Sequence, residues 1–201
     1  RAADALSAVG IANASARLKQ YPHEFSGGMR QRAMIGMALT GRPKLIVADE
    51  PTTALDVTVQ RQVMGVLHRA QEETGAAIVF ISHDIALVSA FCDRVIVMKD
   101  GRVVEALSAG RIRQDAQHPY TKALMSSVPV PDPVIEATRE RILLTGDLPS
   151  PADPPTGCRF HTRCPFRQAE RCDTERPALR ELRPGHAVAC HYAEEILAGS
   201  V

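Results

Sequence analysis

Two acidic residues and a histidine follow apolar runs, at positions where they can do chemistry. The run "KLIVAD" ends at Asp49 and is followed by Glu50, and the run "AAIVFIS" ends at Ser82 and is followed by His83. If both runs are neighbouring parallel strands, their carboxyl ends share the sheet edge at which ligands bind. One of the two acids can then hold Mg²⁺, usually through water, while the other polarises an attacking water. Each feature alone has a plainer interpretation, namely a solvated turn with a helix cap, and a histidine that caps or packs.

A third feature is the stretch Ser26, Gly27 and Gly28, which stands directly before a helical pattern. The start of a helix presents unpaired backbone N–H groups and the positive end of the helix dipole, which favour an anion. Glycines have no side chain, so phosphate oxygens can approach the main chain. Alone, such a stretch is more often a turn. Together with the acidic strand end, it predicts a site for a phosphate group.

The elements that must position these residues alternate between helix and strand. Apolar residues recur at helical spacing from Met29 to Leu39, and a glycine and a proline then close the helix. A strand at 44–49, an amphipathic helix at 58–75 and a strand at 76–82 follow, and we expect both strands to be buried. This order is typical of a parallel crossover unit. We therefore predict an α/β layer within residues 1–107.

The pattern continues and then changes character. A helix is expected at 84–92, and two strands within 93–107 are joined at Asp100 and Gly101, which is the best hairpin signal in the chain. Beyond residue 107 come a helix at 119–128, the proline-rich stretch "VPVPDP" and a segment with four of the five cysteines. Residues 108–201 are therefore predicted to form an appended extension.

The composition excludes several classes of protein. With 201 residues, 45% of them hydrophobic, and a net charge of +1, the chain suits one domain plus an appendage. No window approaches the roughly eighteen consecutive apolar residues of a membrane-spanning helix, so any membrane contact is expected to be peripheral. Residues 151–201 carry seven arginines and seven acids, and this local balance argues against binding nucleic acid. The odd number of cysteines and the lack of a secretion signal indicate a reducing cytosol.

The cysteines of the extension are candidates for metal ligation. Their spacing is C-x5-C-x7-C-x17-C, and they are Cys158, Cys164, Cys172 and Cys190. Four thiolates can ligate zinc or an iron–sulfur cluster, although the tight pairs of structural zinc sites are missing. Four reduced thiols without a metal are the alternative. The fifth, Cys92, is expected in the core. Three nearby histidines are expected to be surface or hydrogen-bonding residues: His161, His186 and His191.

In order and separation, "FSGGMRQR", "LIVADEPTTALD" and "ISHD" resemble the signature sequence, Walker B strand, D-loop and switch histidine of ATP-binding cassette (ABC) ATPases. By this resemblance, Asp49 supports Mg²⁺, Glu50 is the catalytic glutamate, and His83 hydrogen-bonds the terminal phosphate of ATP. Ala54, Leu55 and Asp56 correspond to the D-loop. Met29 replaces a glutamine found in many members, and we expect this change to be tolerated.

The resemblance implies ATP hydrolysis between two such domains, with Ser26, Gly27 and Gly28 contacting the nucleotide held by the P-loop of the partner. No G-x-x-x-x-G-K-[ST] motif occurs in the chain. The sequence is thus similar to the carboxyl-terminal part of an ABC P-loop NTPase domain that begins within the helical subdomain. We expect the 201 residues alone neither to bind ATP tightly nor to hydrolyse it.

A second resemblance covers roughly residues 108–192. "QHPYTKALMSSVPVPDP" and the cysteine segment resemble the carboxyl-terminal extension of ATPase subunits from oligopeptide, dipeptide and nickel importers. This implies uptake of short peptides or a related small solute, driven from the cytoplasmic face of the cell membrane. The implied partners are a second, identical or paralogous ATPase subunit, two permease subunits and, indirectly, a solute-binding protein.

The importer resemblance also implies a [4Fe–4S] cluster at the four cysteines, with Zn²⁺ as the alternative. Two other functions remain open at this point. One is a soluble ABC ATPase of DNA repair or translation, although no coiled-coil or zinc-finger insertion is seen. The other is a non-catalytic metal-binding module, which would leave Asp49, Glu50 and His83 without a purpose.

Overall fold

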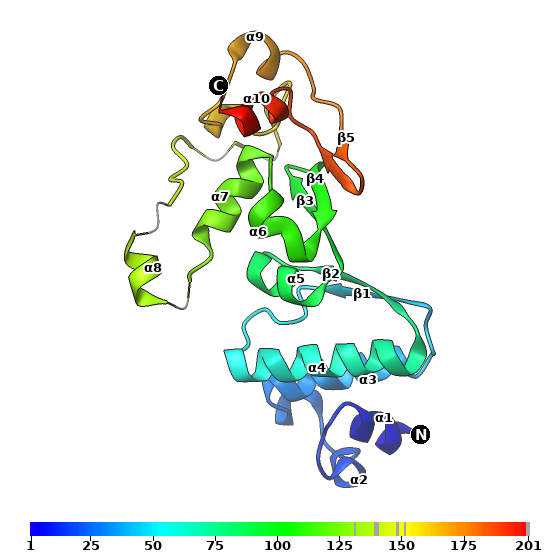
Figure 1. Cartoon of the computed structure of the whole chain (residues 1–201). Helices are drawn as coiled ribbons and strands as arrows, with labels where there is room; N and C mark the ends of the chain where they lie inside the picture. Colours follow the sequence, from blue (N-terminus) through cyan, green and yellow to red (C-terminus); the bar gives the residue numbers. More distant parts are fainter. Residues whose placement is uncertain (131, 139–140, 148, 151, 200–201) are drawn as a thin grey trace. The chain divides into compact units, whose positions relative to one another are not determined.

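The computed structural model describes residues 1–130, 132–138, 141–147, 149–150 and 152–199 (Figure 1). The chain divides into two compact units, Arg1–His83 and Asp84–Val201. Part of the predicted proline-rich stretch lies outside the described residues. In the part of the chain that is described, no helix has the length and apolar character needed to cross a membrane.

The first unit is mainly helical. Its elements are α1 (Ala2–Ala8), α2 (Ala14–Arg17), η1 (Pro22–Glu24), α3 (Gly27–Leu39), β1 (Leu45–Asp49), α4 (Val57–Thr74) and β2 (Ala77–Ile81). Helix α3 packs against both α1 and α4. The side chains of Val9, Val63 and Leu67 are almost completely buried in this core. The predicted strand–helix–strand order of the crossover unit is therefore confirmed.

Strands β1 and β2 are parallel neighbours, with Leu45 opposite Ala77 and Asp49 opposite Ile81. The prediction that both strands are buried is wrong for one face of the pair, where the side chains are exposed. In β1 only Ile46 and Ala48 are buried. Four apolar side chains on the two strands are about half exposed or more, so no described element covers that face: Leu45, Val47, Val79 and Ile81. An apolar run predicts a strand, but its burial depends on what packs on each face.

The second unit contains an antiparallel sheet with helices around it. Its elements are α5 (Ile85–Phe91), β3 (Arg94–Lys99), β4 (Arg102–Ser108), η2 (Ala109–Arg111), α6 (Ile112–Asp115), α7 (Pro119–Ser127), α8 (Pro133–Thr138), η3 (His161–Arg163), α9 (Ala169–Cys172), β5 (Arg180–Arg183), β6 (His186–Val188) and α10 (Ala193–Ala198). The predicted hairpin is present. Asp100 and Gly101 both have positive φ, of 46° and 74°, as a tight two-residue turn requires.

The sheet of the second unit joins sequence-distant segments, in the strand order β3-β4-β6-β5. Strand β6 pairs with β4, so that Glu105 lies opposite Val188 and Ala106 opposite Ala187. The predicted boundary between residues 107 and 108 falls inside this unit, at the end of β4. As a division of the chain it stays a prediction, but the end of the extension shares a sheet with the hairpin that precedes it.

Candidate functional site

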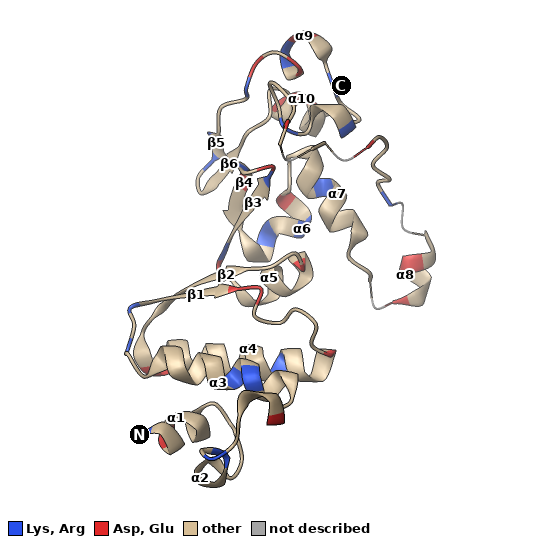
Figure 2. Cartoon of the chain, turned by 180° about the vertical axis from the view of Figure 1, so that it is seen from behind, with Lys and Arg blue, Asp and Glu red and all other residues tan. Residues whose placement is uncertain are grey.

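The end of β1 holds Glu50 in a defined position. The backbone N–H of Glu50 donates to the carbonyl oxygen of Ile81 at 2.9 Å, which continues the pairing of β1 with β2 by one residue. Glu50 has φ 44°, in the left-handed region that non-glycine residues seldom adopt. The hydroxyl of Thr53 donates to Glu50 Oε2 at 2.6 Å, and His83 Nδ1 lies 3.2 Å from Glu50 Oε1. Glu50 and His83 lie at one sheet edge, as expected, and the structure adds a direct contact between them; Figure 2 shows the acidic end of β1 in red.

These contacts set the charge of Glu50. The hydrogen bond from Thr53, followed by that from His83, lowers the pKa of the Glu50 carboxyl below its ordinary value. Glu50 is therefore ionised at neutral pH. Each of its two carboxylate oxygens already has a hydrogen-bond partner, Thr53 at Oε2 and His83 at Oε1. Sequence analysis did not single out Thr53. Its signal is a hydroxyl three residues after the acid, the spacing of a short turn, and the Thr53 N–H indeed donates to the Glu50 carbonyl oxygen at 3.2 Å.

The predicted phosphate site lies at the start of α3. Ser26 is the N-cap, and its hydroxyl accepts from the backbone N–H of Met29 at 3.3 Å. A Cβ on Gly28 would lie 2.2 Å from Val59 Cγ1, so the missing side chain there lets α3 approach α4. A Cβ on Gly27 would meet Leu55 Cδ2 at an ordinary 3.5 Å. The expectation that both glycines open the backbone to an anion therefore fits Gly27, which is exposed, better than the buried Gly28.

The segment between β1 and α4 follows the predicted D-loop. Ala54 has φ 60°, and Asp56 is the N-cap of α4, where its Oδ1 accepts from the Val59 N–H at 2.9 Å. Asp49 ends β1 and is exposed. The contacts of Gly27 and Gly28 with Leu55 and Val59 place the start of α3 beside the start of α4.

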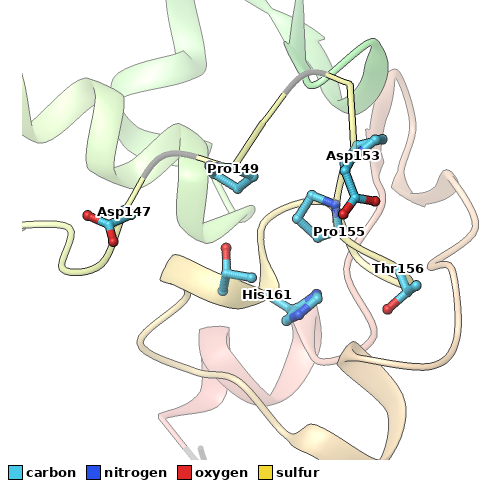
Figure 3. A pocket seen from close by; sticks show the side chains of 8 residues that line it. Asp147, Pro149, Asp153, Pro155, Thr156 and His161 are labelled. Atoms are coloured by element: carbon cyan, nitrogen blue, oxygen red, sulfur yellow. The ribbon is translucent and has the colours of Figure 1, made fainter.

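Two cavities of the described residues are lined by none of the predicted nucleotide residues. The first unit has a cavity of about 1180 Å³ among α1, α3 and α4. The second unit has one of about 510 Å³ beside η3 (Figure 3), and its lining is Asp147, Pro149, Asp153, Pro154, Pro155, Thr156, His161 and Thr162. The predicted residues Ser26, Asp49, Glu50 and His83 are all exposed instead. These four residues of the predicted nucleotide site therefore lie at the surface of the first unit.

The four cysteines of the extension carry free thiols, like Cys92, which is half-buried. Burial raises the pKa of Cys164 to about 12 and that of Cys190 to about 11, and the other thiols add to both shifts, so the four lie in one region. In the described ranges, no three or more His, Cys, Asp or Glu residues are grouped so that they could hold a metal ion. The expected [4Fe–4S] cluster or zinc at Cys158, Cys164, Cys172 and Cys190 is therefore not supported.

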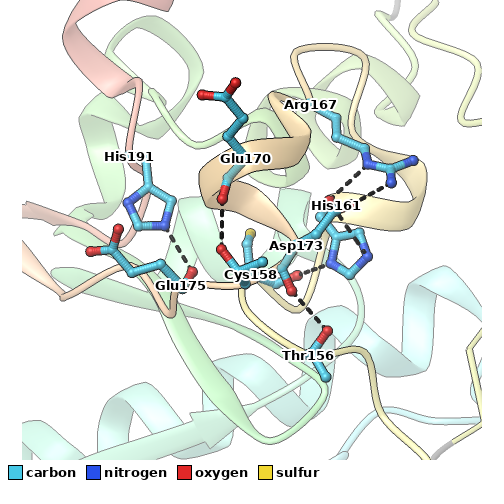
Figure 4. A network of polar contacts seen from close by, with 9 residues as sticks. Thr156, Cys158, His161, Arg167, Glu170, Asp173, Glu175 and His191 are labelled. Carbon is cyan, nitrogen blue, oxygen red and sulfur yellow. Dashed lines mark hydrogen bonds and ion pairs between the residues drawn. The ribbon is translucent and has the colours of Figure 1, made fainter.

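The backbone around the thiols is fixed by polar contacts (Figure 4). The Cys158 N–H donates to the Cys172 carbonyl oxygen at 2.8 Å, and His161 Nδ1 donates to the Cys158 carbonyl oxygen at 2.9 Å. Arg167 pairs with Asp173, and His191 Nε2 donates to the Glu175 carbonyl oxygen at 2.8 Å. The prediction that these two histidines make hydrogen bonds is confirmed, although His161 is buried.

A buried polar cluster in the second unit escaped sequence analysis. Glu105 of β4 is fully buried, and its Oε1 accepts from the Gln117 N–H at 2.7 Å and lies 2.8 Å from His186 Nε2 of β6. Its Oε2 accepts from the His118 N–H at 3.2 Å. His118 Nδ1 in turn accepts from the Tyr120 N–H at 3.1 Å and caps α7. We call Glu105, Gln117, His118 and His186 the buried cluster. It binds β4, β6 and the start of α7 together.

Two family models match the chain. The one described as "ABC transporter" matches residues 1–53, and the one described as "Oligopeptide/dipeptide transporter, C-terminal region" matches residues 104–172. The first match includes Ser26, Gly27, Gly28, Asp49 and Glu50. The second includes the buried residues Glu105, Gln117 and His118 and three of the four cysteines.

Curated relatives match most of the chain. YkfD of Bacillus subtilis, named for oligopeptide transport and ATP binding, is 54% identical over 172 residues, which are 86% of this chain and 52% of that protein. The oligopeptide transport ATP-binding proteins AppF of Bacillus subtilis and OppF of Haemophilus influenzae are 50% and 48% identical, with the same coverage. The chain spans about half the length of these relatives.

A solved structure also matches, namely cbiO1 from Clostridium perfringens, part of the ABC transporter complex cbiONQ. It is 34% identical and covers 56% of this chain and 43% of that chain, with a TM-score of 0.49. The two family models and the curated relatives agree on one assignment. The chain belongs to the ABC transporter family, in the group of ATP-binding proteins that carries the oligopeptide/dipeptide transporter carboxyl-terminal region.

Proposed function

We propose that this chain is part of an ATP-hydrolysing subunit that powers the import of short peptides or a related small solute. The single observation that carries the hydrolytic role is the contact of Glu50 with Thr53 and His83 at the carboxyl ends of two parallel strands. The names of the relatives support peptide import, and they concern proteins of about twice this length.

In the proposed mechanism Glu50 acts on the attacking water. A carboxylate with a lowered pKa is a weaker proton acceptor, so orientation of the water is the role that its present contacts favour. Full proton abstraction would first require loss of the hydrogen bonds from Thr53 and His83. His83, with a side chain that is 75% exposed, can turn from Glu50 to a phosphate oxygen and stabilise the charge that develops there.

The remaining residues have supporting roles. Asp49, at the exposed end of β1, would hold Mg²⁺ through water. The N-terminus of α3, with Ser26 and Gly27, would contact the phosphates of a nucleotide bound to a second ATPase subunit. Asp56 would keep the start of α4 beside it through the cap on Val59. The exposure of these residues supports this arrangement, because a site shared between two subunits is open in either one alone.

The proposed partners follow from the same assignment. They are a second ATPase subunit, two permease subunits and, indirectly, a solute-binding protein, with the subunit located at the cytoplasmic face of the membrane. The match of residues 104–172 to the transporter region favours this over a soluble ABC ATPase of DNA repair or translation. No step of the mechanism passes through a metal at the four cysteines, because the described residues do not form a site for one.

The test is ATP hydrolysis by the complete ATP-binding protein, assembled with its permease, after the substitution Glu50→Gln. We expect the turnover number to fall by about 100-fold or more while ATP still binds, because the amide cannot orient or activate water as a carboxylate does. The matched control is Glu73→Gln, which changes an exposed acid of α4 in the same unit. Unchanged hydrolysis in the Glu50 variant would remove Glu50 from the mechanism.

A further inference from the structure

Arg32 of α3 bridges two backbone carbonyl groups of the first unit. Its Nε donates to the Gly28 carbonyl oxygen at 3.3 Å, one turn earlier in the same helix, and its Nη1 donates to the Gly10 carbonyl oxygen at 2.8 Å. Gly10 lies in the turn that follows α1. The planar guanidinium suits this task, because its donors point in fixed and different directions. One side chain thus ties the first turn of α3 to the turn after α1.

The Gly10 carbonyl is anchored by its neighbours. The side chains of Val9 and Ile11, on either side of Gly10, are buried, with 0% and 3% exposed. Gly10 itself has φ 75°, which a glycine adopts without strain. A Cβ at this position would lie 3.4 Å from Arg32 Nη1, so the guanidinium packs directly on the glycine. Arg32 therefore connects the start of α3 to backbone that the core holds in place.

The start of α3 is held from a second direction by α4, through the close approach of Gly28 to Val59. Both contacts act on Gly28, which is buried, whereas Ser26 and Gly27 directly before it are exposed. The exposed residues are the ones that can meet a ligand, and the buried residue behind them is fixed. A helix start that is already oriented favours binding of an anion, because less conformational freedom is lost when the anion binds.

We propose that Arg32 is a positioning residue for the predicted phosphate site. By fixing the Gly28 carbonyl it orients the first turn of α3, whose N–H groups would contact a phosphate of the nucleotide bound to a second ATPase subunit. Arg32 acts through the backbone and not by contact with the nucleotide. The inference rests on the proposed function and adds a residue to it.

The first measurement needs no nucleotide. Amide hydrogen exchange is followed in this chain at Met29 and Arg30, whose N–H groups donate to Ser26 Oγ at 3.3 Å and to the Ser26 carbonyl oxygen at 2.9 Å. Arg32→Gln should accelerate exchange at both positions by about fivefold, because the helix start opens more often without its second anchor. The matched control is Arg69→Gln, an exposed arginine of α4 in the same unit, which should leave exchange unchanged. Unchanged exchange in the Arg32 variant would overturn the proposal.

The second measurement is ATP hydrolysis by the complete ATP-binding protein, assembled with its permease. Arg32→Gln should raise the KM for ATP by about fivefold and change kcat less, because a phosphate contact is weakened in the ground state and the transition state alike. A loss of stability alone would reduce the amount of active protein and leave KM unchanged. Arg32→Lys keeps the charge but carries all its donors on one nitrogen, so it should recover only part of the effect.

The outcomes distinguish this inference from the proposed function. A KM for ATP that stays at the wild-type value in Arg32→Gln overturns the positioning role. Full recovery by Arg32→Lys, or an equal rise of KM in Arg69→Gln, overturns it as well, because charge alone would then explain the effect. A complete wild-type protein that does not hydrolyse ATP would refute the proposed function instead, and the exchange measurement would still decide whether Arg32 holds the start of α3.

Discussion

Two clusters of the molecule each pair a glutamate with a histidine, but they differ in solvent exposure and in hydrogen-bond partners. Glu50 at the end of β1 accepts from Thr53 and lies beside His83, on a surface where the His83 side chain is 75% exposed. Glu105 in β4 accepts from two backbone N–H groups and lies beside His186, with no exposure at all. Both clusters pair a glutamate with a histidine across two strands, but only the first leaves room for a ligand.

The difference in exposure distinguishes a cluster that can bind a ligand from one that can only stabilise the fold. An exposed carboxylate can exchange its partners for water or phosphate at little cost, because solvent replaces each lost contact. A buried carboxylate cannot, since every lost hydrogen bond leaves an unpaired group in a medium of low polarity. The same pair of residue types would therefore serve the proposed reaction in one unit, whereas it holds strands together in the other. Substitutions should separate the two roles.

The largest effect on stability is expected for Glu105→Gln. An amide presents an NH2 group where the carboxylate presents an oxygen, so at least one buried donor loses its acceptor, and the charge that faces His186 is lost. Breaking a buried pair of this kind costs about 3 kcal/mol or more. Amide hydrogen exchange should accelerate in β4, β6 and α7. Glu50→Gln, the same change at the exposed cluster, should leave these rates and the thermal midpoint unchanged.

The control tests what holds β6 in place. If exchange in β6 stayed slow in the Glu105 variant, strand pairing alone would hold the end of the extension and the buried cluster would be incidental. Because the chain divides into two compact units, exchange resolved by residue is more informative than one global transition.

A second effect depends on pH and involves His118. Burial lowers the pKa of His118 from its ordinary 6.5 to about 4. The unfolded chain therefore binds a proton below about pH 6.5 that the folded chain binds only near pH 4, and stability should fall over this interval as the pH is lowered. The predicted loss is up to about 3 kcal/mol. It should be absent above pH 7, where both states are neutral.

His118→Asn sharpens this prediction, because asparagine can also cap α7 but does not titrate. Chemical denaturation at pH 7 and pH 4.5 should show a smaller pH dependence in this variant. His68→Asn is the control, since His68 is an exposed residue on α4 that lies 3.6 Å from Glu72. An equal reduction in both variants would assign the pH dependence to surface charge instead.

The two regions also differ in how far the sequence predicts them. Helix and strand limits in the first unit follow from local signals: Ser26 and Asp56 cap helices by their side chains, and Gly75 ends α4 with φ 68°. The order of two apolar runs also predicts that Glu50 and His83 reach one sheet edge, but the direct contact between them is seen only in the structure. The contact of Glu105 with His186 spans 81 positions, and an acid within an apolar hairpin strand carries no local sign of a buried partner. Short strands such as β5 and β6 depend on the sheet that they join, so local patterning does not predict them.

A third prediction concerns the glycines at the start of α3. Gly28→Ala should destabilise the first unit by about 2 kcal/mol, because the new methyl group would overlap Val59 Cγ1 and must force α3 from α4. Gly27→Ala places the same methyl group at ordinary contact distance and should have little effect on stability. Thermal unfolding of both variants, and of Gly28→Ala combined with Val59→Ala, checks this. Failure of the double variant to recover stability would contradict the packing explanation.

The smallest expected effect concerns the charge of Glu50 itself. Thr53→Val and His83→Ala should each raise the pKa of the Glu50 carboxyl towards its ordinary value, and Thr53→Val should raise it more, since the hydrogen bond from Thr53 is the larger cause of the lowered pKa. A carbon-detected NMR titration of the side chain measures both changes. The shifts should be modest, because water replaces each lost partner at this exposed site. If His83→Ala produced the larger shift, the histidine would hold Glu50 more firmly than the threonine does. His83 would then have to give up a stronger contact before it could turn to a phosphate, and Glu50 would be released for proton abstraction in the same step.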